Sequence, residues 1–151
     1  MTTTENSPQA SLAPYIAVTD AAAAIKFYAE AFGARECYRL TDPSGKIGHA
    51  ELDIGGQLLM LADEYPDFGS VSPVSLGGSP VKFLITVDDV DAALVKATDA
   101  GATVVRPASD EFHGHRQALV ACPFGYQWFL SRQVEAVAPA EMQRRFNAAF
   151  E

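Results

Sequence analysis

The chain has 151 residues, and 48% of them are hydrophobic, which is enough for one domain with a buried core. Its formal net charge of −8 argues against nucleic acid or an anionic membrane surface as a main partner. No apolar stretch approaches the roughly 20 residues of a membrane span, and the polar residues 1–11 do not resemble a secretory signal. We therefore expect a cytoplasmic protein whose residues 1–11 form a disordered lead-in.

The first half of the chain predicts the order β-α-β-β-β. A short strand is expected at 13–18, and Asp20 then caps a helix over 21–32, because its side chain can accept hydrogen bonds from the first-turn amides. Gly33 follows as the residue that ends the helix. The remaining elements are three strands, at 35–40, 47–54 and 57–62.

The second half predicts the same order. A strand is expected at 81–87, and Asp89 caps a helix that runs to about residue 100. A short strand at 103–106 is predicted to stop at Pro107. The final hairpin is predicted from strands at 116–121 and 126–131.

Two further segments connect and follow these halves. Residues 63–80 are rich in Gly, Pro and Ser, which favours either a plain linker or a lid over a ligand site. Residues 139–150 form an amphipathic helix in which Met142, Phe146 and Phe150 share one face. That face is typical of core or dimer packing.

Cys37 and Cys122 are far apart and form no CxxC pair, so we expect two reduced thiols.

The two halves are related by an internal repeat. Shifted by 69 positions, Ile16 falls on Ile85 and Asp20 falls on Asp89. The same shift aligns turn glycines: Gly45 with Gly114, and Gly56 with Gly125. Two copies of one supersecondary unit are therefore expected to face each other, with a ligand at the seam between them.

Four segments resemble a known superfamily: YIAVTDAAAAIKFYAEAFGA, GHAELDIGGQLLMLADE, VDDVDAALVKATDAGATVVRP and CPFGYQWFL. Together they resemble the glyoxalase/bleomycin-resistance/extradiol-dioxygenase superfamily, also called vicinal oxygen chelate proteins, and its PhnB-like branch in particular. The resemblance covers roughly residues 12–132 and implies an α+β fold with two βαβββ modules. Their sheets would form a pseudo-symmetric cup with helices outside, and most relatives would be homodimers.

This resemblance also divides the chain. Module one takes residues 12–62, the linker 63–80, and module two 81–132, while 133–151 hold the C-terminal helix. The cup of the family's enzymes holds a divalent metal on His or Glu residues of the first and last strand of each module. Counting from the repeat places those positions on residues with no suitable donor: Ala13, Met60, Lys82 and Phe129. Such side chains do not form a hard-metal site, so we predict no cofactor.

Strand alternation indicates which side chains point into the cup. In the strand at 47–54, His49 and Glu51 share one face, and the small apolar set Ala50 and Leu52 lies on the other. The 69-residue shift relates position 47 to Arg116 and places it on the cup side as well. The predicted ligand-binding residues are Tyr15, His49, Glu51, Met60, Lys82, Leu84, Arg116, Gln127 and Phe129.

The polar members of this set suggest two kinds of chemistry. Lys82 and Arg116 favour a small organic ligand that carries an anionic group. His49 and Glu51 are the candidate catalytic residues, because a histidine can act as acid or base near neutral pH. The alternative for Glu51 and Lys82 is a structural ion pair with each other.

A second group of donors lies near the last hairpin. His113 and His115 flank Gly114, and they form either a simple turn or a non-standard metal site with Asp110, Glu111 or His49. Motifs for nucleotide binding, serine hydrolysis and zinc proteolysis are missing from the sequence.

Three functions follow. The first is a small-molecule-binding protein of this fold without the usual metal. The second is an enzyme, a glyoxalase-like lyase or isomerase or a dioxygenase, that uses a non-standard metal or a His/Glu acid–base pair. The third is a dimeric structural module without a ligand.

Overall fold

The computed structural model describes residues 11–151, so all but the last residue of the predicted lead-in lies outside the described residues. In chain order the elements are β1 (Tyr15–Val18), α1 (Ala21–Phe32), β2 (Arg35–Thr41), β3 (Ile47–Ile54), β4 (Gln57–Asp63), η1 (Pro66–Phe68), α2 (Pro73–Leu76), β5 (Lys82–Thr86), α3 (Val90–Ala100), β6 (Thr103–Asp110), β7 (His115–Ala121), β8 (Gln127–Gln133) and α4 (Pro139–Ala148).

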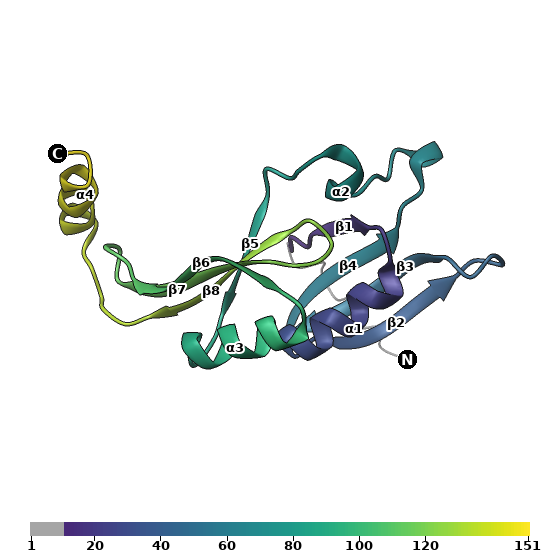
Figure 1. Ribbon diagram of the computed structural model, residues 1–151, viewed down its shortest axis with the longest axis horizontal. Helices are drawn as coiled ribbons and strands as arrows, with labels where there is room; N and C mark the ends of the chain where they lie inside the picture. Colours follow the sequence, from purple (N-terminus) through teal and green to yellow (C-terminus); the bar gives the residue numbers. More distant parts are fainter. Residues whose placement is uncertain (1–10) are drawn as a thin grey trace, which may run out of the picture.

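The strands form two four-stranded sheets with the same topology. Sheet one has the order β1-β4-β3-β2 and sheet two the order β5-β8-β7-β6, and the first strand of each lies parallel to the last. The other pairs are antiparallel. The predicted α+β fold with two βαβββ modules is therefore confirmed. The sheets lie along the long axis of the molecule, with α1 and α3 side by side (Figure 1).

Both long helices begin as the repeat predicts. The Asp20 side chain accepts a hydrogen bond from the Ala23 amide at 3.0 Å, and Asp89 accepts one from Ala92 at 3.0 Å. Each cap satisfies an amide that has no partner inside its helix. The two modules therefore share the local signal that starts their helices.

The core joins the modules through α1. Tyr28 is completely buried, and its ring lies 5.2 Å from that of Trp128 in β8. Phe32 also contacts Trp128, with 5.0 Å between ring centroids, and Phe27 contacts Phe124. The apolar face of one helix thus buries side chains of both modules and holds them together.

The largest error in a predicted boundary concerns β6. The strand that was expected to stop at Pro107 continues to Asp110. Its pairing with β7 shifts register between Val104 and Arg106, and again between Arg106 and Ser109. Proline has no amide hydrogen for the ladder, but an interruption of regular pairing can accommodate it.

The linker between the modules has structure of its own. It contains η1 and α2, and the Glu64 carboxylate accepts hydrogen bonds from the Ser72 amide and the Ser75 hydroxyl at 2.7 and 2.6 Å. Tyr65 donates to Asp42 at 3.0 Å, which ties the linker to the turn before β3. The linker is therefore anchored to sheet one through the turn between β2 and β3.

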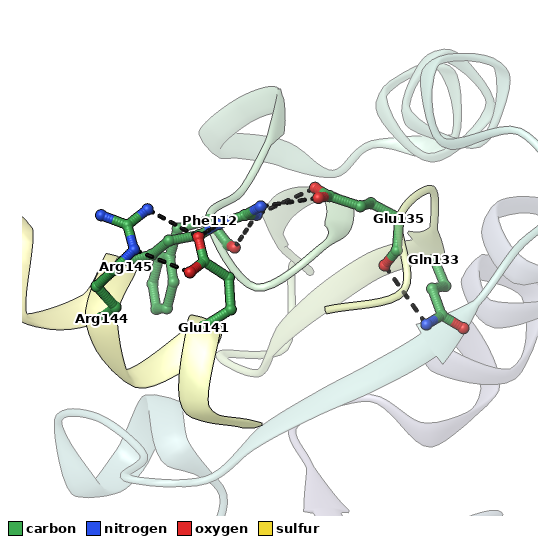
Figure 2. A network of polar contacts seen from close by, with 6 residues as sticks. All are labelled: Phe112, Gln133, Glu135, Glu141, Arg144 and Arg145. Carbon is green, nitrogen blue, oxygen red and sulfur yellow. Dashed lines mark hydrogen bonds and ion pairs between the residues drawn. The ribbon is translucent and has the colours of Figure 1, made fainter. Parts of the chain in front are cut away.

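The C-terminal helix α4 lies at the end of the molecule opposite sheet one (Figure 1). It ends at Ala148, two residues before the predicted end. Arg145 donates two hydrogen bonds to Glu135, at 2.8 and 3.0 Å, and one to the Phe112 carbonyl at 3.0 Å (Figure 2). This arginine fastens α4 to the β6–β7 turn.

Candidate functional site

The side of sheet one away from α1, called here the open face, carries a row of side chains from all four strands. Strand pairing aligns Tyr15 of β1 with Met60 of β4, Met60 with Glu51 of β3, and Glu51 with Tyr38 of β2. Residues directly opposite each other in a sheet point to the same side. The row therefore brings together residues that are up to 45 positions apart in sequence.

His49 joins this row one pleat away and links its polar members. Its Nδ1 lies 2.9 Å from the Tyr15 hydroxyl, and its Nε2 lies 2.9 Å from Oε2 of Glu51. The Tyr38 hydroxyl donates to the same carboxylate oxygen at 2.7 Å. These four residues, called here the relay, form a continuous hydrogen-bonded chain on the open face.

Charge distribution within the relay follows from these contacts. The hydrogen bond from Tyr38 and then that from His49 lower the pKa of Glu51, because both favour its ionised form. Bonding to that carboxylate raises the pKa of Tyr38. Partial burial, and next the charge of Glu51, raise the pKa of Tyr15. At neutral pH the relay thus holds one carboxylate and two neutral phenols.

Tyr15 is the member most accessible to solvent. Its exposure is 52%, against 45% for Tyr38, while His49 and Glu51 are half-buried. Tyr15 also lines a concavity of about 370 Å³ together with Tyr65 and Phe68 of the linker. A ligand on this face would meet the Tyr15 hydroxyl before the imidazole behind it.

Sheet two presents a different set of residues on the corresponding face. Strand pairing aligns Leu84 with Phe129, and Lys82 with Gln127. The Arg106 guanidinium lies 5.6 Å from the centre of the Phe129 ring. Four predicted binding residues therefore share one face: Lys82, Leu84, Gln127 and Phe129.

Two members of the predicted set line different concavities. Leu84 lines one of about 440 Å³ at the seam of the modules, together with Leu58 and Trp128. Tyr15 lines the one beside the linker. Glu51 bonds to His49 and Tyr38, so the alternative expectation that it pairs with Lys82 is not what the structure shows.

Arg116 does not lie with the others, and its predicted position is corrected. It donates to Asp91 of α3 at 2.8 Å and to Asp110 at 3.1 Å, on the helix side of sheet two. The reason is a change in the repeat. Glu51 pairs with Met60 and Leu119 pairs with Phe129, so the offset between the modules is 68 in β7 but 69 in β8. A one-residue slip turns every side chain of a strand to the other face.

The histidines do not assemble into a shared site. His113 and His115 contact each other, with 3.2 Å between their Nδ1 atoms, in the turn that supports α4. His49 lies in the other sheet, and residues 11–151 contain no group of three His, Cys, Asp or Glu side chains placed to hold a metal. The turn interpretation therefore describes the pair, and the predicted metal alternative gains no support.

Sequence analysis missed Tyr38. It is one of several polar or aromatic residues in β2, and nothing in its local pattern separates it from its neighbours. Its role depends on the register with β3, where a shift lies between Glu36 and Tyr38. Only a known strand pairing would have revealed it.

Comparisons with known proteins agree with this architecture. The model of the Glyoxalase/Bleomycin resistance protein/Dioxygenase superfamily matches residues 9–130. The chain belongs to this superfamily. It is 45% identical over 141 residues to a protein of Mycobacterium bovis, an alignment that covers 91% of this chain and 93% of the relative.

Solved structures show the same fold. TioX from Micromonospora sp. ML1 superposes with a TM-score of 0.63 and 31% identity, over 83% of this chain and 99% of TioX. An Arabidopsis thaliana protein superposes with a TM-score of 0.65 and 28% identity, over 83% and 98% of the two chains. Separately, none of the helices in residues 11–151 is both long and apolar enough to cross a membrane.

Proposed function

We propose that this superfamily member binds a small organic molecule on the open face of sheet one, without the divalent metal used by the superfamily's enzymes. The observation that carries the proposal is the relay, in which directional polar groups converge beside aromatic side chains. Ligand sites are commonly built from apolar walls with a few such groups. The concavity beside Tyr15 and the anchored linker add a wall to this face.

The residues at the superfamily's metal positions do not fit a metal. Met60 lies in the row of the relay, and Phe129 holds the matching place in sheet two. Phe129 and Ala13 have no donor atom, Met60 offers only a soft thioether, and Lys82 binds metal only after losing its proton. We therefore assign the chain no step that passes through a metal.

The test is a thermal-shift screen of the full chain with small carboxylates, thiol conjugates, phenols and aromatic antibiotics. A true ligand raises the unfolding midpoint, because it binds the folded state alone, and saturation at about 100 times Kd is worth roughly 2.7 kcal/mol. The shift should be lost in Tyr15→Ala. A panel with no stabilising compound, or stoichiometric metal in the purified protein, would contradict the proposal.

A specific contact favours acid–base catalysis as a second candidate. The 2.9 Å bond between His49 and Glu51 has the geometry of a base held by a carboxylate. Turnover of a bound ligand that is abolished by His49→Gln would establish an enzyme. Binding with no turnover would favour the first candidate.

We also propose a homodimer in which the open face of sheet one meets sheet two of a second copy. The two faces differ in charge, since sheet one carries Glu51 and the Asp53–Arg35 ion pair while sheet two carries Lys82 and Arg106. A two-fold arrangement would pair unlike faces twice. Leu84, 54% exposed, would be covered. The divided set of predicted binding residues would then meet across the interface.

Native mass spectrometry tests this assembly, with Leu84→Asp as the disrupting variant because it places an acidic group opposite acidic residues. The control is Leu76→Asp, which changes an exposed leucine of the linker. A monomeric wild-type chain would contradict the dimer. The PhnB-like branch and a cytoplasmic location remain our proposals, the latter supported by the free thiols of Cys37 and Cys122.

A further inference from the structure

Tyr15 is the member of the relay that lies between a bound ligand and the imidazole of His49. Both ring nitrogens of His49 are engaged, Nδ1 with Tyr15 and Nε2 with Glu51. A ligand therefore reaches the imidazole through the Tyr15 hydroxyl, which also lies 3.3 Å from the Gly48 carbonyl. The titratable groups around His49 are Tyr15 from β1, Tyr38 from β2 and Glu51 from β3.

The hydrogen bonds set the starting protonation. The Glu51 carboxylate accepts from Tyr38, so the proton between Glu51 and His49 belongs to Nε2 of the imidazole. In the neutral imidazole Nδ1 is then an acceptor, and the Tyr15 hydroxyl donates to it. In this state the Tyr15 oxygen offers only lone pairs to a ligand. The ligand must therefore donate a hydrogen bond to this oxygen in order to bind well.

We propose that the relay takes a proton from an acidified phenol, one whose ring carries an electron-withdrawing group that brings its pKa near the ordinary histidine value, and binds it as the phenolate. This rests on the proposed function and names its ligand class. The ligand O–H gives its proton to the Tyr15 oxygen while the Tyr15 proton moves to Nδ1 of His49. Tyr15 then donates to the phenolate, and the imidazolium is balanced by Glu51. No bond between heavier atoms forms or breaks, and no oxidant is needed.

Two features select a phenol over other acids. A carboxylic acid is already ionised at neutral pH and brings no proton, whereas an aliphatic alcohol, or a phenol as weak as tyrosine with a pKa of about 10, is too weak an acid to give one up to imidazole. The walls are aromatic: the Tyr15 and Tyr38 rings lie 5.3 and 5.7 Å from that of His49, and Tyr65 and Phe68 line the adjoining concavity. A flat ring can stack against such surfaces.

The experiment uses 4-nitrophenol, because its neutral and ionised forms have different absorption spectra. The full-length protein is titrated into the probe at a pH below the probe's own pKa, where the free probe is mostly neutral. We expect the phenolate spectrum to appear on binding. In Tyr15→Phe and His49→Gln we expect phenolate formation to require about tenfold more protein, or more, because the proton has no route or no acceptor.

Two controls separate proton transfer from simple stacking. His113→Gln makes the same exchange as His49→Gln in the turn that supports α4, outside the relay, and should leave the spectrum unchanged. The probe 4-nitroanisole has the same ring without the acidic proton and should bind more weakly than 4-nitrophenol. Circular dichroism and the unfolding midpoint of each variant confirm that it is folded.

The outcomes are distinguishable. Binding of 4-nitrophenol in its neutral form, or equal affinity for 4-nitroanisole, would overturn the proton transfer and leave small-molecule binding intact. Lack of any 4-nitrophenol binding would overturn the phenol class, while a hit elsewhere in the thermal-shift panel would still support the proposed function. Unchanged phenolate formation in Tyr15→Phe would overturn the assigned route.

Discussion

Sheet one and sheet two have the same topology, but the side chains on their matching faces are mainly polar in sheet one and mainly apolar in sheet two. Where sheet one aligns Tyr15, Met60, Glu51 and Tyr38, sheet two aligns Leu84, Phe129, Leu119 and Arg106. Three members of the first row belong to the hydrogen-bonded relay, whereas the second row is an apolar strip that ends in a cation over an aromatic ring. A duplicated fold can therefore keep its backbone while each copy acquires a different role.

The modules also differ in the surroundings of their matching turn glycines, Gly45 and Gly114. This difference gives the largest predicted effect on stability. Gly45 and Gly114 both have positive φ, 95° and 93°. A Cβ at Gly45 meets nothing within 4 Å, whereas one at Gly114 would overlap the Glu135 carbonyl oxygen. Both Gly→Ala variants should lose roughly 1–2 kcal/mol through the left-handed backbone. Gly114→Ala should lose about 1–3 kcal/mol more through the clash.

Chemical denaturation of the two variants measures that difference. Gly45→Ala is the matched control, because it shares the backbone conformation and lacks the contact. An equal loss of unfolding free energy in both variants would mean that the segment at Glu135 does not pack closely against Gly114 in the β6–β7 turn.

The helix caps are the feature that the modules share most closely, so they should respond alike. Asp20→Ala and Asp89→Ala each remove one side-chain bond of 3.0 Å to a first-turn amide. We expect each variant to lose about 1 kcal/mol of unfolding free energy. Asp→Asn at either position, which keeps an acceptor, should lose much less. A large inequality between the two positions would show that one helix depends on its cap more than the other.

The C-terminal helix tests an addition that belongs to module two alone. Arg145→Met removes the bonds to Glu135 and Phe112 but keeps the length of the side chain. We expect faster amide hydrogen exchange in α4 with a nearly unchanged global midpoint, because exposed ion pairs contribute little to global stability. Arg144→Met, which loses only its two bonds to Glu141 within the helix, is the control. Unchanged exchange in Arg145→Met would contradict the fastening role.

The smallest effect concerns pH and sheet one. The pKa of Glu51 is lowered in the folded state by Tyr38 and His49, so the folded state binds this proton less readily than the unfolded state does. Its contribution to stability is therefore present above the ordinary glutamate pKa of about 4.3 and is lost as pH falls through the lower folded value. The difference between wild type and Glu51→Gln should be constant near neutral pH and shrink in acid. A constant difference down to the acid limit would contradict the ionised Glu51.

Much of the fold was predictable from local patterns. The caps at Asp20 and Asp89 and the alternation that buries Ala50 and Leu52 are short-range signals, and the structure confirms them. The site was only partly predictable. His49 and Glu51 are two residues apart in one strand, so alternation placed them together. Arg116 was misplaced because one residue is lost between the modules, a change that pattern matching at a fixed offset does not detect.

The sequence alone determined the repeat, the caps of the two long helices and the types of residue at the superfamily's metal positions, because these depend on residue identity and on spacing within a few residues. Tertiary structure decided which residues act together. Tyr15, Tyr38 and Glu51 come from three strands, and only their register aligns them in one row. Register is a long-range property, set by how the core packs under the sheet, and a shift of one residue would have pointed the relay into that core.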